Sequence, residues 1–360
     1  MNANIGIDIG KRKCDYCIVN EEGAVVDRGQ YRNTAKDAKR FAMDVATRYS
    51  RKCRAACETT ARMWLKTYEA FESAGIDIKV ANTYKMALIA KTAKKTDKVD
   101  AEKIAQVLRM DMIPACYMPP HEIRSIRNTI RQRVKLARDR TKVVNRIHSL
   151  LDAHDVPLYA KKAYSAKALL YLESVDLKDG HDKAVLGQCI RNIRYLTGEI
   201  VLIEKRLEET AAKNEDARLL ASMTGVGLFG ALLLAAEIGT VSRFDGAKKM
   251  VSWAGLCPTI RQSGDRMYMG RIKRRDANLL VKWIMCESAH VAARHDPRMK
   301  AVYASALKRH ASRKPLATIV VANKMITIMW HMLKTRTPYE SRNEDLYKRK
   351  LNRMDKACQE

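Results

Sequence analysis

The sequence is poor in acidic residues, and this shortage gives the first indication of its partners. Its 360 residues contain 40 Asp and Glu against 68 Lys and Arg, so the formal net charge is +28 and the pI is near 9.8. An excess of this size predicts a polyanionic partner. Nucleic acid is favoured over ribosome association or a membrane surface, which would give the same composition.

Long uninterrupted apolar runs are also missing. The first ten residues contain no apolar export segment, and the longest apolar stretch, 316–333, is interrupted by Asn323, Lys324 and His331. A membrane-spanning helix needs about 20 predominantly apolar residues with few charges. The stretch is therefore predicted to be a buried helix, and we expect a cytoplasmic protein with no membrane partner.

A complete set of zinc ligands is absent as well. The nine cysteines include one Cys-x-x-Cys pair, Cys14 and Cys17, but neither a second such pair nor a pair of histidines completes a zinc site. On a strand, side chains three positions apart point to opposite faces. These two thiols are therefore predicted to be packed in the interior of a protein from a reducing compartment.

Residues 1–115 have the order of a ribonuclease-H-like (RuvC-like) α/β domain. Ile5, Ile7 and Ile9 alternate with Gly6 and Asp8, which is the period of a strand with one apolar face. Three strands that form an antiparallel start are predicted at 5–9, 16–19 and 24–31. Helices are predicted after 34, at 62–73 and at 97–110, and further strands at 53–57 and 76–81.

Residues 116–215 are predicted to form a basic helix followed by a coiled-coil region. Between 121 and 148 nine cations face only two acids, with apolar residues at helical spacing. The alternatives are a solvated helix face and a phosphate-binding face. The second is favoured, and its candidate contacts are Arg124, Arg127, Arg131 and Arg138. A heptad stripe within 186–213 could pair inside the chain or between protomers.

Residues 216–345 are predicted to form a mainly helical domain, followed by a basic tail at 346–360. Gly225 and Gly227 precede an apolar helix at 228–238. Backbone N–H groups at a helix start suit a phosphate, so a helix-hairpin-helix-like DNA contact is one interpretation. A tight turn between two packed helices is the equally weighted alternative.

Four carboxylates carry the chemistry that we predict: Asp8, Glu58, Asp97 and Asp100. They come from two strands and the start of one helix, and oxygen ligands of this kind suit Mg²⁺ or Mn²⁺. The glycines on both sides of Asp8 are predicted to leave room for an ion and a DNA backbone. Asp100, Ile104 and Leu108 step by four, so Asp100 is predicted to point inward and to need a cation. Asp97 could instead be only a helix cap, and Glu58 only a loop acid.

The strand pattern around Asp8 has another interpretation. A Gly-x-Asp-x-Gly strand also opens the sugar-kinase-like and actin-like ATPases. Those proteins should carry a second glycine-rich phosphate loop and an adenosine-binding glycine motif, and we find no convincing copy of either in this sequence.

These motifs together resemble the DEDD transposases of insertion sequences, insertion-sequence family one-ten, which are related to the Piv-type DNA invertases. The first half matches at Asp8, Glu58 and the Lys-Thr-Asp-Lys-Val-Asp-Ala run at 95–101, and the second half at 225–227, 254–258 and 262–264. The resemblance implies a RuvC-like domain, a coiled-coil insertion and a transposase domain. It also implies that the four carboxylates bind Mg²⁺ and that Ser263 forms a covalent bond with DNA.

The same resemblance implies the partners. They are double-stranded donor and target DNA, a structured bridge RNA that guides the protein, and further copies of the chain in a dimer of dimers in a prokaryotic, nucleoid-associated setting. Arg261, Arg271 and Lys273 lie near Ser263 and either neutralise phosphate or are surface cations. A hydrolytic RuvC-like nuclease, Holliday-junction resolvase or invertase is one alternative, and a non-catalytic nucleic-acid-binding protein is another.

Overall fold

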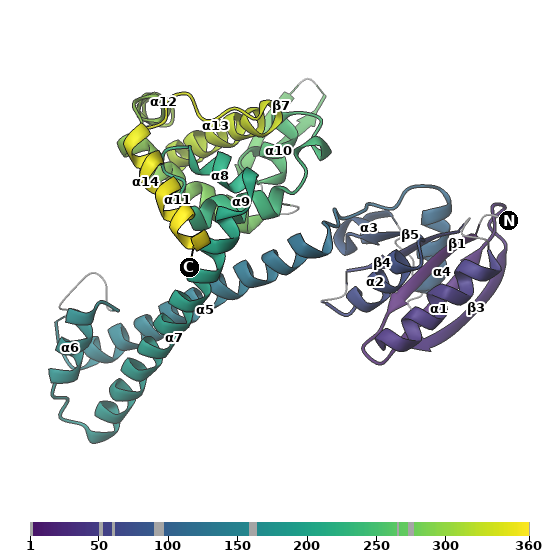
Figure 1. The fold of residues 1–360 in the computed structure, drawn as a ribbon, viewed down its shortest axis with the longest axis horizontal. Coiled ribbons are helices and arrows are strands. Elements are labelled where there is room, and N and C mark those ends of the chain that lie inside the picture. The colour runs from purple at the N-terminus through teal and green to yellow at the C-terminus, as the bar shows by residue number, and fades with distance from the viewer. Residues whose placement is uncertain are drawn as a thin grey trace. The chain divides into compact units, whose positions relative to one another are not determined.

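The computed structural model describes residues 3–49, 53–59, 62–89, 97–157, 164–264, 266–272 and 277–359, with backbone only at 97–99, 261 and 358–359. The chain divides into two compact units, 1–119 and 120–360. The first is a mixed α/β unit and the second is mostly helical (Figure 1).

Unit 1 is built on a five-stranded mixed sheet in the order β3-β2-β1-β4-β5. The strands are β1 (Ala3–Ile9), β2 (Lys13–Val19), β3 (Val25–Arg32), β4 (Cys53–Glu58) and β5 (Asp77–Ala81). The first three pair antiparallel, whereas β4 is parallel to β1 and β5 is parallel to β4. The predicted antiparallel start and the two later strands are therefore confirmed, and the structure adds that these two strands are parallel to β1.

Helices cover both faces of this sheet: α1 (Ala35–Arg48), α2 (Leu65–Ser73), α3 (Thr83–Ile89) and α4 (Asp97–Arg109). The β1 isoleucines are buried with residues of α1 and α2 on one face, and α4 packs on the other. The helix α1 begins where the sequence indicated, because the Thr34 hydroxyl accepts a hydrogen bond from the Asp37 N–H at 3.1 Å. The helix α3 was not predicted.

The two cysteines of the Cys-x-x-Cys pair are packed thiols, as predicted. Cys14 is buried with α1 and α2, and Cys17 is buried beside Ala101 and Ala105 of α4 on the opposite face. Burial raises the pKa of the Cys17 thiol to about 11.

Unit 2 contains a pair of long helices and a helical core. The long helices are α5 (His121–Ala153) and α7 (Gly180–Ala212), with α6 (Ala166–Ser174) between them in sequence. Two buried positions of the heptad stripe, Ile193 and Leu207, lie in clusters that also contain α5 residues, and Ile200 between them is buried as well. The Arg133 guanidinium donates to the Glu204 carboxylate of α7 at 2.9 Å. The stripe therefore packs within the chain.

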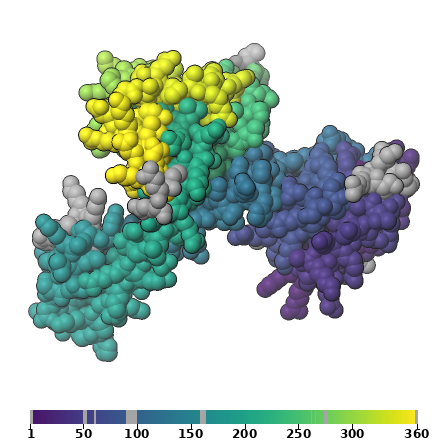
Figure 2. Space-filling view, viewed as in Figure 1, coloured from purple at the N-terminus to yellow at the C-terminus, as the bar shows by residue number. Residues whose placement is uncertain are grey.

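The helical core follows α7 along the chain. Its elements are α8 (Glu215–Ala221), α9 (Leu228–Ile238), the short helix η1 (Val241–Arg243), α10 (Ala247–Trp253), the hairpin β6 (Pro258–Ser263) and β7 (Arg266–Ile272), α11 (Leu279–His295), α12 (Pro297–Arg309), α13 (Lys314–Thr335) and α14 (Glu344–Gln359). C-terminal residues lie on the surface of this unit, in yellow (Figure 2).

The helix α13 contains the apolar stretch noted in the sequence. By length and composition it could span a membrane, but half of its most apolar part is buried inside the fold. Its residues Val321, Met325 and Met329 belong to the main core of unit 2. It is therefore the buried core helix that the sequence predicted.

Candidate active site and nucleic-acid interface

Asp8 and Glu58 lie at the same edge of the sheet. The parallel strands β1 and β4 are in register up to the pair Ile7 and Cys57, and each carboxylate is the next residue of its strand. Both side chains are half-buried. Carboxyl ends of neighbouring parallel strands are a common location for functional groups in α/β folds.

The helix α4 brings its first turn toward this edge. Its far end is fixed near the start of β1, where Arg54, the register partner of Asn4, donates to the Leu108 carbonyl at 3.1 Å. The Gln106 amide also donates to the Gly23 carbonyl at 2.8 Å. Gly23 follows the end of β2, and this end of β2 pairs with the start of β1. Because α4 crosses β1 from this end, its first turn, with Asp97 and Asp100, lies on the side of Asp8.

Gly6 allows this close crossing. A Cβ atom on Gly6 would lie 2.0 Å from the Ala101 carbonyl oxygen and 2.4 Å from the Ala105 nitrogen. The glycine before Asp8 was expected to leave room for an ion and a DNA backbone, but the space is filled by the α4 backbone. Gly6 thus determines how near Asp100, the neighbour of Ala101, comes to β1.

Asp100 differs from its prediction in one respect. Ile104 and Leu108 are buried, but the Asp100 side chain is 30% exposed and accepts a hydrogen bond from Lys103 at 2.8 Å. It therefore lies at the rim of the apolar stripe, and its cationic partner in the structure is a lysine.

Sequence reasoning missed a further carboxylate, Asp15. It pairs in register with Asp8 across β1 and β2, so the two side chains share a face. Asp15 is 5% exposed, accepts a hydrogen bond from the Gln30 amide at 2.8 Å and lies 3.8 Å from the Lys13 ammonium. Its signal in the sequence was the hairpin itself, whose register puts it opposite Asp8.

The donor chemistry at this edge fits a hard cation. Carboxylate oxygens are the ligands that Mg²⁺ and Mn²⁺ take, and like charges on facing strand positions are stabilised by a cation between them. Among the side chains that the structure describes, which exclude that of Asp97, no group of three or more His, Cys, Asp or Glu is arranged to hold a metal ion. The four-carboxylate metal site therefore stays a prediction.

Two of the predicted phosphate-binding arginines of α5 make contacts inside unit 2. Arg127, whose side chain is 12% exposed, donates to the carbonyls of Ala236 and Glu237 at the end of α9, at 2.8 and 3.0 Å. Arg131 donates to the buried Glu237 carboxylate at 2.8 Å. Such contacts satisfy the last carbonyls of a helix.

The remaining two arginines leave the phosphate prediction open. Arg138 is exposed and Arg124 is half-buried. The number of charges along α5 does not show which of its arginines can contact a phosphate and which contact the end of α9, because that depends on where α9 ends. Arg131 is 55% exposed and keeps guanidinium surface beyond its contact with Glu237.

Gly225 and Gly227 have different surroundings. Gly225 has φ +90, and a Cβ there would lie 2.4 Å from the Ser288 carbonyl oxygen of α11, so this glycine serves a tight contact between helices. Gly227 caps α9, and a Cβ on it would meet nothing within 4 Å. Only Gly227 keeps the open backbone that a phosphate contact requires.

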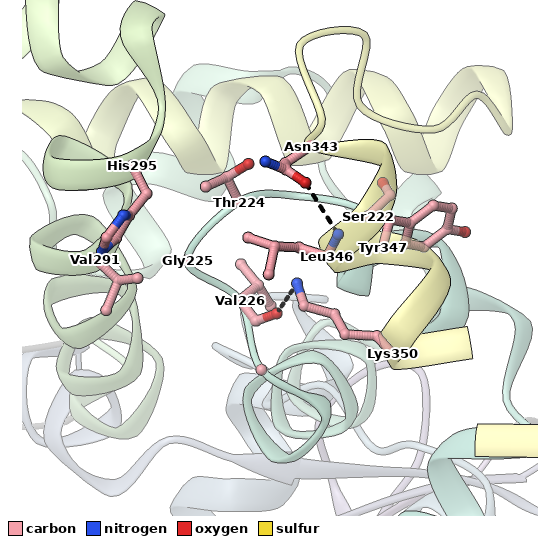
Figure 3. A pocket seen from close by; sticks show the side chains of 11 residues that line it. Ser222, Thr224, Gly225, Val226, Val291, His295, Asn343, Leu346, Tyr347 and Lys350 are labelled. Carbon is pink, nitrogen blue, oxygen red and sulfur yellow. Dashed lines mark hydrogen bonds between the residues drawn. The ribbon is translucent and has the colours of Figure 1, made fainter. Parts of the chain in front are cut away.

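The helix α14 closes the other side of this turn. The Lys350 ammonium donates to the carbonyls of Ala221 and Val226 at 2.8 and 2.7 Å, and Tyr347 lines the same cavity of about 260 Å³ (Figure 3). Burial lowers the pKa of Lys350 to about 8. The segment expected as a basic tail thus contributes a half-buried lysine to the turn.

Ser263 ends strand β6 in a hairpin that the sequence did not reveal. It pairs with Arg266 at the start of β7, and Gly264 follows with φ +57. The serine side chain is exposed. Arg271 is exposed in β7, the backbone of Arg261 belongs to β6, and Lys273 lies outside the described residues.

Comparisons with known proteins match both units in order. Residues 5–155 match the DEDD transposase model of IS110, described as a transposase, and residues 217–304 match the model of the IS116/IS110/IS902 transposase family. The chain is 24% identical over 339 residues to the transposase for insertion sequence element IS1111A of Coxiella burnetii, covering 93% of this chain and 90% of that protein.

Other relatives agree. The transposase for insertion sequence element IS1328 of Yersinia enterocolitica is 24% identical over 241 residues, which are 66% of this chain and 71% of that protein. An uncharacterized 42 kDa protein of insertion element IS900 from Mycobacterium paratuberculosis is 29% identical over 157 residues, covering 43% of this chain and 39% of that protein.

An α/β unit with carboxylates at its strand ends is followed along the chain by a helical unit. Each unit matches a transposase model, and these features together define a transposase. Within that class, the chain belongs to the IS110 family, whose two models together match most of it. These matches do not favour the alternative of a kinase-like or actin-like ATPase.

Proposed function

We propose that this transposase is an RNA-guided, Mg²⁺-dependent DNA recombinase that exchanges strands through a covalent bond between Ser263 and DNA. In this proposal unit 1 is the RuvC-like catalytic domain, α5 and α7 form the coiled-coil region, and the rest of unit 2 is the transposase domain; the protein acts as a dimer of dimers. A bridge RNA pairs with donor and target DNA and supplies sequence specificity.

The single observation that carries the acidic site is the crossing of α4 over β1. Asp8 and Glu58 lie at the carboxyl ends of adjacent parallel strands. Because α4 crosses β1 at Gly6, the first turn of α4 lies at the same edge. Asp8, Glu58, Asp97 and Asp100 are the proposed ligands, and Mg²⁺ bound by them would stabilise negative charge on the attacked phosphate.

Ser263 is the proposed nucleophile because it is exposed at the tip of a two-stranded hairpin, where a DNA backbone can reach its hydroxyl. The Oγ–P bond forms as one P–O bond to a deoxyribose breaks. The serine proton leaves to solvent, and the released deoxyribose oxygen takes up a proton. Attack by a hydroxyl of another strand reverses these steps, so the number of phosphodiester bonds is conserved.

Covalent capture tests the proposal. The protein is incubated with its bridge RNA, Mg²⁺ and an end-labelled duplex of the element junction, and the products are separated under denaturing conditions. We expect a protein–DNA adduct that Ser263→Ala and Asp8→Asn both abolish, while Ser252→Ala, a control in α10, retains it. Cleavage without an adduct, unchanged in Ser263→Ala, would instead identify a hydrolytic nuclease.

A further inference from the structure

A large groove lies in unit 2 beside the serine hairpin. It is bounded by strand β7, the end of α12 and the first half of α13, and its volume is about 1020 Å³. Apolar side chains, among them Pro258, Leu316 and Ile319, line part of its surface. A cavity of this size with an apolar lining is in the range that takes a ligand of nucleotide size.

The rest of the lining is basic. Arg271 of β7, Arg309 of α12, Arg313 before α13 and Lys324 of α13 border the groove, and no Asp or Glu is among its described lining residues. All four side chains are exposed, and within the described part of the chain none of them forms an ion pair with a carboxylate. Charge complementarity therefore favours an anionic occupant.

The turn between α12 and α13 holds two of these cations in place. Ala311 and Ser312 both have left-handed backbones, with φ +47 and +58, although neither is a glycine. Each costs about 1 kcal/mol. The Ser312 N–H donates to the Leu307 carbonyl at 2.9 Å, which closes the turn with Arg309 and Arg313 on either side of it. Strained turns of this kind are concentrated at functional sites.

We propose that this groove binds an unpaired nucleotide of the DNA strand that undergoes exchange. Its phosphates contact the basic residues, and its base packs on the apolar lining. A duplex hides the faces of its bases in the stack, so only an unpaired nucleotide can use both parts of the groove. This inference rests on the proposed function, because it takes the strand beside Ser263 to be DNA.

The hairpin connects the groove to the serine. Pro258 and Met269 line the groove, and Ser263 lies five residues beyond Pro258 along β6. Five strand residues span about 17 Å. An unpaired nucleotide held in the groove would therefore belong to the same strand as the phosphate at Ser263, a short distance along it.

Binding of a short, fluorescently labelled single-stranded DNA to the full chain tests the proposal. For Arg309→Ala/Arg313→Ala we expect roughly a tenfold or greater rise in Kd. We also expect the slope of log K against log salt to fall by roughly 1.4, since each single-strand phosphate contact contributes about 0.7. The matched control Lys36→Ala/Lys39→Ala removes two exposed cations from α1 and should change Kd by less than about twofold.

Three further arms distinguish the occupant. A strand of equal charge with abasic sites should bind the wild type more weakly than the intact strand, and duplex DNA should lose less affinity in the arginine variant than single-stranded DNA does. A larger loss for single-stranded RNA of the same sequence would assign the groove to RNA instead. Three results would each overturn the inference. They are an equal loss of affinity in the two double variants, equal affinity of the wild type for the abasic and the intact strand, and a loss of affinity confined to RNA or to duplex DNA.

The same measurements separate this inference from the proposed function. Ser263→Ala should bind single-stranded DNA as the wild type does, because the hydroxyl is not part of the groove. If no serine–DNA adduct forms but the groove variants still lose single-strand binding, then the proposed chemistry fails and the groove assignment stands.

Discussion

Gly6→Ala is the substitution that most directly connects the fold of unit 1 to its acidic edge. The new methyl group would have to move the Ala101 carbonyl oxygen from 2.0 Å to the 3.4 Å at which ordinary contact begins, a retreat of about 1.4 Å. Both atoms that it meets are backbone, so no flexible side chain can yield. Overpacking of this kind costs about 1–3 kcal/mol, and we expect the upper end of that range.

The same displacement moves Asp100, the residue before Ala101, away from β1. A shift of about 1 Å in a catalytic group can reduce a rate roughly 100-fold. We therefore expect Gly6→Ala to lower the yield of strand exchange by about that factor, in addition to its effect on stability. Urea denaturation and single-turnover strand exchange, both with the full chain, measure the two effects separately.

Gly75→Ala is the matched control in the same unit. Gly75 has φ +72, but a Cβ there would meet nothing within 4 Å. Its substitution should cost only the left-handed backbone strain, about 1 kcal/mol, and should leave strand exchange unchanged. A Gly6→Ala protein as stable and as active as the wild type would refute the account of how α4 meets β1.

Three other predictions concern unit 2. Glu237→Ala should lower the free energy of unfolding by about 3 kcal/mol in urea, because it leaves Arg127 and Asn278 without their buried carboxylate; a loss below about 1 kcal/mol would contradict this. Gly225→Ala should cost about 3 kcal/mol or more, whereas Gly227→Ala should stay within about 1 kcal/mol, and equal costs would refute the different roles of the two glycines. The pKa of Lys350 falls on folding from 10.5 to about 8, so the unfolded state binds more protons between these values and stability gains a contribution as pH rises through that window. Relative to Lys350→Met, the wild type should therefore gain stability from pH 8 to pH 10; a pH-independent difference would show that the lysine is not desolvated.

Much of unit 1 could be predicted from the sequence because its signals are local. Alternating isoleucines predicted β1, and Thr34 indicated the start of α1. The spacing of Cys14 and Cys17 predicted that their side chains lie on opposite faces of the sheet. Such patterns depend on one element at a time.

Other features depend on contacts between distant residues. Arg127 could not be distinguished from a phosphate-binding arginine until the end of α9 lay beside it, 109 residues away in sequence. The β6–β7 hairpin was missed because its residues alternate little, and Ile260, Met267 and Met269 are exposed on it. Gly6 signalled room beside Asp8, but only the structure identified α4 as the occupant.

The most direct test of the proposed mechanism is the location of the covalent bond. Adduct formed with bridge RNA, Mg²⁺ and junction DNA is digested with nuclease and protease, and the peptides are analysed by mass spectrometry. The account predicts a nucleotide remnant on the peptide that contains Ser263, and on no other. A remnant on another residue, or strand exchange with no modified peptide at any time point, would contradict it.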